Sequence, residues 1–137
     1  MQWSSEKNAG FSDAEPWFPV NENYKEINVA AQNKDPDSLL NFYRRLIKFK
    51  LDNPVALYGD YKELCKESDN LYAYIREYEG KKLLVVCSFT AESVRFEAPE
   101  DLDLKKAEAV FTNYEFNYVV ANGFTARPYE VRVYLFE

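Results

Sequence analysis

The sequence contains no histidine, and this absence excludes several kinds of catalytic site. Without imidazole the chain can build neither a Ser-His or Cys-His nucleophile pair nor a zinc site with histidine ligands. Glycine is also scarce. Gly10, Gly59, Gly80 and Gly123 are isolated from one another, so each is interpreted as a turn residue and no glycine-rich phosphate loop is expected. We therefore expect no cofactor and no metal ion.

Cysteine and long apolar runs are equally rare. Cys65 and Cys87 are too few for a disulfide framework, and we interpret them as reduced thiols, Cys87 in a strand and Cys65 near a surface turn. No apolar run approaches the roughly 20 residues that a membrane-spanning helix needs, and the N-terminus lacks the pattern of a signal peptide. These features predict a cytoplasmic protein without a membrane partner.

Acidic residues outnumber basic ones, with 23 Asp and Glu against 17 Lys and Arg and a net charge of −6. An acidic chain without a basic cluster is not expected to bind nucleic acid. The length of 137 residues suggests one domain of ordinary size, and the hydrophobic content of 47% is enough for a core.

A helix is predicted over residues 35–53. Asp35 is a suitable N-cap, Pro36 fits the first helical position, and Pro54 ends the helix. Its apolar residues cover about half of the circumference. They are Leu39, Leu40, Phe42, Tyr43, Leu46, Ile47 and Phe49. An arc of this width indicates that the helix packs against neighbours on more than one side.

Residues 54–137 are predicted to form short antiparallel strands. The candidates are segments 71–78, 82–89, 94–97, 107–114 and 129–136. Glu79-Gly80-Lys81 predicts a hairpin, and the continuous apolar run from Leu83 to Val86 is typical of a strand covered on both faces. The spacing favours a small antiparallel β-sandwich, preceded by one α-helix and an irregular N-terminal segment. Asn122-Gly123 is interpreted as a turn and nothing more.

In the last strand the alternation separates two faces. Val131, Val133 and Leu135 share one face, whereas Arg132, Tyr134 and Phe136 share the other.

Carboxylates and aromatic rings are the candidates for chemistry. Carboxylates in turns and on polar faces are interpreted as solvated surface, not as a glycosidase acid pair. They include Asp60, Glu63, Glu67, Asp69, Glu100, Asp101 and Asp103. Rings that could stack on a pyranose are Trp3, Trp17, Tyr24 and Tyr118. In residues 54–137 such rings are better explained as core or cross-strand pairs, but no regular element explains the rings of residues 1–34.

Four segments in order carry a family resemblance. They are MQWSSEKNAGFS, PWFPVNENYKEINVAAQ, DPDSLLNFYRRLIKFK and NPVALYGDY, and the ending ARPYEVRVYLFE adds to them. Together they resemble the C-terminal part of bacterial α-glucosidases of glycoside hydrolase family 13, with oligo-1,6-glucosidase as the nearest type. Trehalose-6-phosphate hydrolases and sucrose-processing relatives share much of the pattern. The resemblance spans nearly the whole chain, and residues 1–55 carry most of its specificity.

The resemblance implies a domain organisation. Residues 1–34 would be a loop of a (β/α)8 barrel, residues 35–53 the last barrel helix, and residues 54–137 the C-terminal β-sandwich. Met1 then matches an internal methionine of the motif, so we expect an excised piece whose partner is the absent catalytic barrel. The wide apolar arc of the helix fits this expectation, because barrel strands would cover one side of it.

The resemblance also bears on function. The parent would hydrolyse α-glucosidic bonds of short oligosaccharides, and Gln2 and Trp3 would line the mouth of its pocket. The family's catalytic carboxylates lie upstream of the MQW motif, so no catalytic residue is assigned and the chain alone is expected to be inactive. Ser4 and Ser5 stand where the motif usually continues with an acidic residue. An independent carbohydrate-binding module remains the alternative, and self-association through the uncovered apolar surface is expected.

Overall fold

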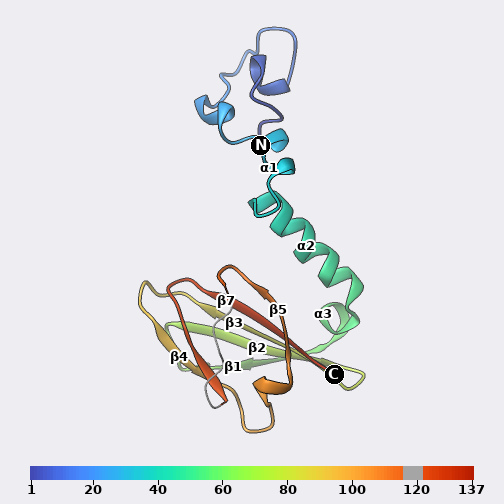
Figure 1. The fold of residues 1–137 in the computed structure, drawn as a ribbon, viewed down its shortest axis with the longest axis vertical. Helices are drawn as coiled ribbons and strands as arrows, with labels where there is room; N and C mark the ends of the chain where they lie inside the picture. Colours follow the sequence, from blue (N-terminus) through green and yellow to red (C-terminus); the bar gives the residue numbers. More distant parts are fainter. Residues whose placement is uncertain (116–121) are drawn as a thin grey trace. The chain divides into compact units, whose positions relative to one another are not determined.

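The structure of the chain is a computed structural model that describes residues 1–115 and 122–137 (Figure 1). It divides into two compact units, which are described separately: the N-terminal unit (Met1–Phe49) and the sandwich unit (Lys50–Glu137). Tyr118, one of the rings considered for sugar stacking, lies outside the described residues.

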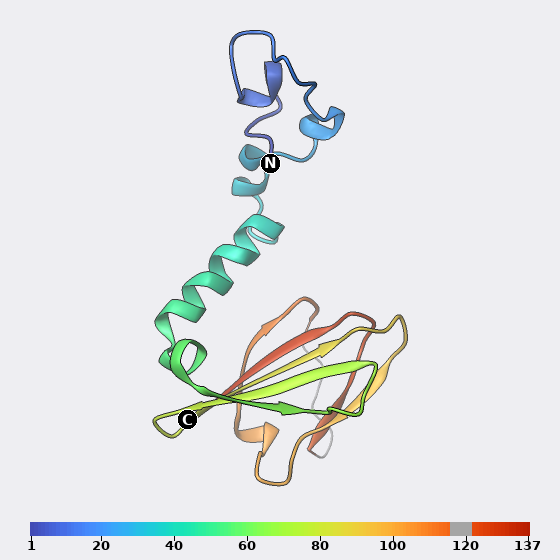
Figure 2. The ribbon, with the colours of Figure 1, turned by 180° about the vertical axis from the view of Figure 1, so that it is seen from behind.

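The sandwich unit contains two antiparallel sheets, as Figures 1 and 2 show from opposite sides. Within the described residues, the larger sheet has the strand order β1 (Asp60–Leu64), β2 (Leu71–Tyr78), β3 (Lys81–Ser88), β7 (Val131–Phe136), β5 (Glu108–Thr112). The smaller sheet pairs β4 (Val94–Glu97) with β6 (Gly123–Ala126). This architecture confirms the predicted antiparallel sandwich. Strands β1 and β6 were not among the predicted segments.

Apolar side chains from both sheets form one core. The cluster comprises Leu71, Ala73, Ile75, Leu84, Val86, Phe96, Leu102, Leu104, Phe124, Ala126 and Tyr134. Alternate residues of β2 and β3 therefore point toward the smaller sheet, as period-two strands require. The face of β7 that carries Arg132 and Tyr134 is the inner one, since these residues pair with Val86 and Leu84.

The hairpin between β2 and β3 forms as predicted. Glu79 and Gly80 adopt φ angles of 49° and 82°, the left-handed conformations that a two-residue hairpin turn favours. Leu83 to Val86 are all buried. Leu84 and Val86 face the core, whereas Leu83 and Val85 face the side that carries helix α3 (Pro54–Tyr58).

Helix α3 is held by one arginine of β2. Arg76 pairs with Leu83, so its side chain lies on the outer face of the larger sheet. Its guanidinium donates to the carbonyl oxygens of Ala56 at 2.9 Å and Gly59 at 2.7 Å, at the C-terminal end of α3. A cation that satisfies the free carbonyls of a helix end stabilises that end.

Asn122 does more than begin a turn. Its side chain accepts the Leu104 N–H at 3.0 Å and donates to the Pro99 carbonyl at 3.2 Å, so it fixes the segment that carries Leu102 and Leu104 into the core. The interpretation of Asn122-Gly123 as a turn and nothing more was therefore wrong.

The predicted helix 35–53 was wrong at its start. Helix α2 spans Leu39–Asp52, and the preceding residue Ser38 accepts the Asn41 N–H on its hydroxyl oxygen at 3.3 Å. Asp35 does not cap α2: its carboxylate accepts the N–H of Asp37 at 2.9 Å and closes a local turn. This competing side-chain bond explains why the Asp-Pro sequence delays the helix. Pro54 ends α2 as predicted, but it also opens α3.

The N-terminal unit is less irregular than predicted. It holds the short helix α1 (Val29–Lys34) and two 3₁₀ turns, η1 (Lys7–Gly10) and η2 (Glu22–Lys25). The carbonyls of Gln2 and Trp3 accept the first two N–H groups of α1, from Val29 at 2.9 Å and Ala30 at 3.0 Å. The side chain of Asn28 accepts the third. The first residues of the chain thus cap a helix.

Part of the apolar surface of helix α2 is exposed. None of its residues is buried, and side chains spaced four positions apart are exposed on one stripe. They are Leu39, Tyr43, Ile47 and Leu51. Among the described residues no helix is long and apolar enough to cross a membrane.

Candidate functional site

A cavity of about 350 Å³ lies within the first 21 residues of the N-terminal unit. We call it the aromatic cavity. It is lined by Met1, Gln2, Phe11, Pro16, Trp17, Phe18, Pro19, Val20 and Asn21. Two amide side chains among apolar and aromatic groups are typical of small-molecule sites, where a few polar groups fix the orientation of a ligand.

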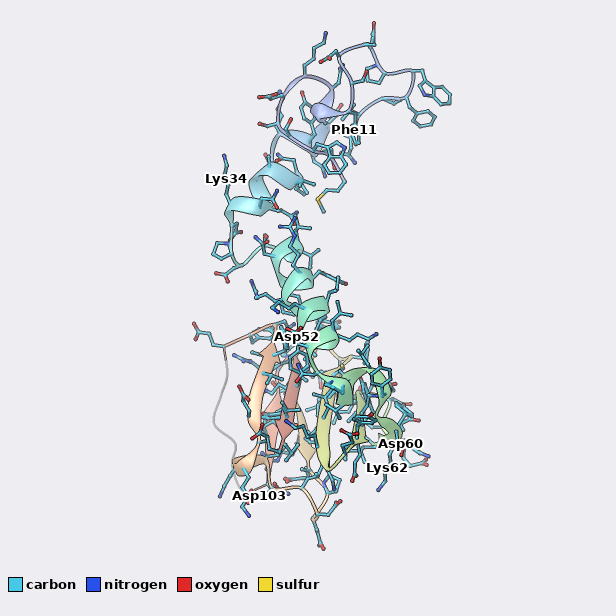
Figure 3. All side chains as sticks on the ribbon, turned by 90° about the vertical axis from the view of Figure 1, so that its right-hand side faces the viewer. Phe11, Lys34, Asp52, Asp60, Lys62 and Asp103 are labelled. Atoms are coloured by element: carbon cyan, nitrogen blue, oxygen red, sulfur yellow. The ribbon has the colours of Figure 1, made fainter. Side chains whose placement is uncertain are left out.

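The rings at this cavity are open to solvent. Trp17 is 94% exposed, and its ring meets that of Phe18 edge to face with centroids 5.4 Å apart. Phe11, which Figure 3 labels in the N-terminal unit, is also exposed. Flat, accessible rings can stack on the apolar face of a sugar, so the structure retains Trp17 as a candidate.

Of the two predicted site residues, only Gln2 lines the cavity. Gln2 is half-buried, and its Nε2 donates to Asn23 Oδ1 at 2.5 Å. The side chain of Trp3 is not among the lining groups, and the residue is 57% exposed. Its backbone is fixed, because its N–H donates to the Ala9 carbonyl at 3.0 Å and its carbonyl accepts from Ala30.

A second hollow of about 270 Å³ adjoins the aromatic cavity and shares Pro16, Phe18, Pro19 and Val20 with it. Tyr24, another predicted ring, lines this hollow and not the larger one. Asn8 lies here too. Trp17 therefore lines the aromatic cavity, whereas Tyr24 lines the neighbouring hollow.

Asparagine side chains hold the backbone around the two hollows in its turns. Asn8 adopts φ 55°, a conformation that asparagine tolerates better than most residues, and its Nδ2 donates to the carbonyls of Ser12 and Ala14 at 2.8 Å each. Asn28 is buried, and it donates to the Tyr24 carbonyl at 2.9 Å while capping α1. The loop geometry therefore depends on amides that turn the chain.

Asn21 and Asn23, as well as Phe11 and Phe18, were not predicted from the sequence. The four asparagines between positions 8 and 28 were the available signal, since asparagine favours turns and caps. The aromatic residues gave no periodic signal.

The carboxylates that we interpreted as solvated surface are mostly exposed. All seven are exposed except Glu63, which is half-buried, and Figure 3 shows Asp60 and Asp103 on the outside of the sandwich unit. Asp101 lies 3.7 Å from the ammonium of Lys82, and Asp103 lies 3.6 Å from that of Lys106. In the described part of the chain no group of three or more Cys, Asp or Glu residues is placed to hold a metal ion.

Glu130 is a buried carboxylate, but its partners make it structural. It accepts Arg132 Nε at 2.8 Å, Arg127 Nη2 at 3.0 Å and the Arg127 backbone N–H at 2.8 Å. Burial raises the pKa of Glu130, but the hydrogen bonds from Arg127 and Arg132 outweigh it, so the pKa lies below its ordinary value of 4.5. A general acid needs the opposite shift.

The thiols are also unsuited to nucleophilic chemistry. Cys65 and Cys87 are free, and burial raises the pKa of both. A raised pKa keeps the sulfur as a thiol near neutral pH, whereas the thiolate is the reactive form.

Two known protein families match successive parts of the chain. Residues 1–59 match the family described as alpha amylase, catalytic domain, and residues 61–133 match the family described as maltogenic amylase, C-terminal domain. The chain belongs to the α-amylase family of glycosidases, and its sandwich unit is a C-terminal domain of that family.

Several individual proteins are similar to the chain over nearly its whole length. The chain is 40% identical over 134 residues to an oligo-1,6-glucosidase of Bacillus cereus, and 40% identical over 139 residues to one of Halalkalibacterium halodurans; each alignment covers 98% of this chain. The structure of trehalose-6-phosphate hydrolase from Bacillus licheniformis matches 98% of the chain with a TM-score of 0.86 and 35% identity. The isomaltulose synthase SmuA from Protaminobacter rubrum also matches 98% of it, with a TM-score of 0.86 and 39% identity.

The chain spans about a quarter of the length of these relatives, 24% in each of the four cases. A match that runs through both units in one alignment does not favour the alternative of an independent carbohydrate-binding module.

Proposed function

We propose that the chain is the C-terminal part of an α-glucosidase of the oligo-1,6-glucosidase type, which hydrolyses α-glucosidic bonds of short oligosaccharides. The identity to oligo-1,6-glucosidases over 98% of the chain is the observation that carries this proposal. Residues 1–34 would be a barrel loop, residues 35–53 would contain the last barrel helix, and residues 54–137 would be the accessory sandwich. The catalytic barrel is then the partner, and its oligosaccharide is the substrate.

In this proposal the N-terminal unit contributes to the mouth of the sugar pocket. Gln2 would supply the amide and Trp17 the ring, whereas Trp3 would act through its fixed backbone. The sandwich unit would support the barrel and take no part in the chemistry. A cytoplasmic location is supported by the two free thiols.

The first test uses the chain as it stands. Purified chain incubated with p-nitrophenyl α-glucoside is expected to release no nitrophenol, because the catalytic carboxylates of the family are expected upstream of the MQW motif. Turnover above a buffer control would contradict the proposal.

The second test uses the longer protein that contains this chain. It is expected to hydrolyse isomaltose and p-nitrophenyl α-glucoside, and Gln2→Ala is expected to lower kcat/KM by about 5- to 50-fold, the loss typical of one or two hydrogen bonds to substrate. Failure of the unaltered protein to hydrolyse any α-glucoside would overturn the assignment. Activity without any effect of Gln2→Ala would remove only the role of Gln2.

A further inference from the structure

Gln2 borders the aromatic cavity, and its side chain is long enough to adopt many rotamers. A free glutamine side chain loses conformational entropy when it is fixed. A residue that orients the amide beforehand therefore strengthens any contact that Gln2 makes with a ligand. In the structure, Asn23 provides such a contact through its Oδ1, which accepts Gln2 Nε2 at 2.5 Å.

The backbone of Asn23 makes three hydrogen bonds. Its N–H donates to Asn21 Oδ1 at 3.1 Å, and its carbonyl accepts the N–H groups of Glu26 at 3.0 Å and Ile27 at 2.9 Å. These bonds close the η2 turn, and Asn21 also lines the aromatic cavity. The acceptor that faces Gln2 thus belongs to a residue whose backbone is held in the η2 turn.

We propose that Asn23 is a positioning residue, which orients the Gln2 amide at the aromatic cavity for a sugar hydroxyl. Asn23 occupies one N–H of the Gln2 amide and leaves the Oε1 acceptor and the second N–H for a ligand. One acceptor and one donor on a planar amide match the hydroxyl groups of a pyranose, each of which donates and accepts. The exposed ring of Trp17 offers the complementary apolar face. The inference rests on the proposed function.

Two variants of Asn23 distinguish the loss of its contact with Gln2 from damage to the η2 turn. Asn23→Asp keeps an oxygen that accepts from Gln2, whereas Asn23→Leu has a similar size and no acceptor. In ¹⁵N-labelled chain, the side-chain amide signal of Gln2 is expected to shift in Asn23→Leu and to keep its position in Asn23→Asp. An unchanged Gln2 signal in Asn23→Leu would show that the contact is absent in solution and would overturn the proposal.

Kinetics of the longer protein test the consequence for substrate. Asn23→Leu is expected to raise KM for isomaltose by about 3- to 10-fold with little change in kcat, and Asn23→Asp is expected to stay within about twofold of the unaltered protein. Gln2→Ala combined with Asn23→Leu is expected to be no worse than Gln2→Ala alone, since Asn23 acts through Gln2. If the two Asn23 variants have equal melting temperatures, a difference between their KM values reflects the position of Gln2 and not the stability of the fold.

The outcomes distinguish the positioning role of Asn23 from the α-glucosidase assignment. Losses that multiply in the double variant, or an Asn23→Leu protein with the unaltered KM, would overturn the positioning role while leaving the α-glucosidase assignment in place. A longer protein without α-glucosidase activity would overturn both.

Discussion

At the residue scale, Glu130 and Arg132 are the side chains whose environment the sequence predicted least. Alternation in the last strand correctly placed Arg132 with Tyr134 and Phe136, but it did not indicate that this face points into the core. An arginine on a strand face usually signals solvent. Here the guanidinium lies 4.1 Å from the centroid of the Phe124 ring and is paired with Glu130, which directly precedes β7.

Replacing Glu130 by Gln is expected to destabilise the chain by about 3–5 kcal/mol, because it leaves two guanidinium groups near a buried neutral amide. Urea unfolding at pH 7, followed by Tyr and Trp fluorescence, measures the loss. Glu137→Gln is the matched control, since Glu137 is exposed and lies 3.4 Å from Lys81 at the surface. Its expected cost is under about 1 kcal/mol.

The same carboxylate predicts a pH dependence. The folded pKa of Glu130 is lowered, so the unfolded chain binds its proton first as the pH falls. The stabilisation is therefore present above the unfolded pKa, near 4.5, and is lost as the pH decreases through the folded pKa. Urea midpoints between pH 7 and pH 3 are expected to fall less steeply in Glu130→Gln than in the unaltered chain. Parallel curves would contradict this.

Gly123 occupies a second position that tolerates little change. A Cβ atom there would lie 2.3 Å from the Phe96 carbonyl oxygen, which belongs to the paired strand β4. Gly123→Ala is expected to cost about 1–3 kcal/mol in urea unfolding, because backbone must move. Gly80→Asn is the control: Gly80 has φ 82° with nothing within 4 Å, and asparagine accepts that conformation. Similar losses in both variants would argue against the steric explanation.

At the scale of elements, the strands and the main hairpin were predictable because their signals are local. Period-two alternation indicated β7, the apolar run from Leu83 to Val86 indicated β3, and Glu79-Gly80 indicated the turn that joins β2 and β3. Helix starts were less predictable. Asp35-Pro36 and Ser38 are both good candidates for starting a helix, and only the bond from Asp37 to Asp35 decides between them. Helix α3 was missed since five residues carry no clear period.

This assignment of the helix start predicts a contrast between two alanine variants. Ser38→Ala is expected to cost about 0.5–2 kcal/mol, because Ser38 accepts the Asn41 N–H and also donates to the Gln32 carbonyl at 2.7 Å. Asp35→Ala removes only a turn contact and is expected to cost less. Circular dichroism at 222 nm during urea unfolding compares them. A larger loss for Asp35→Ala would favour the original prediction of the cap.

At the scale of the whole molecule, the family was recognisable from residues 1–55, yet the cavity was not. Its lining comes from residues 1–21, which lack a secondary-structure period, so pattern analysis had no basis for placing Phe11, Trp17 and Phe18 together. Gln2 lines this cavity, but its place at the mouth of the parent's sugar pocket, which the resemblance implies, stays a prediction. Asn23 was not predicted, since its role depends on a contact between residues far apart in sequence.

The exposed stripe on α2 predicts self-association of the isolated chain. A fully buried Leu or Ile side chain contributes about 1.5–3 kcal/mol, so pairing of such stripes is favourable. Sedimentation velocity is expected to show a concentration-dependent dimer, and Leu39→Gln with Ile47→Gln is expected to weaken it about tenfold or more. Lys105→Gln, at an exposed site in the sandwich unit, serves as the control. A monomer at every concentration would refute the prediction.

The capping of α1 by the first residues has a practical consequence for trimming by proteases. If an aminopeptidase removed Met1 to Trp3, two N–H groups of a six-residue helix would lose their acceptors. The damage would spread, because Gln32 at the other end of that helix accepts the Leu40 N–H at 3.0 Å and so ties α1 to the start of α2. Removal of three residues would thus also weaken the contact between α1 and the start of α2, so an affinity tag for this chain belongs at its C-terminus.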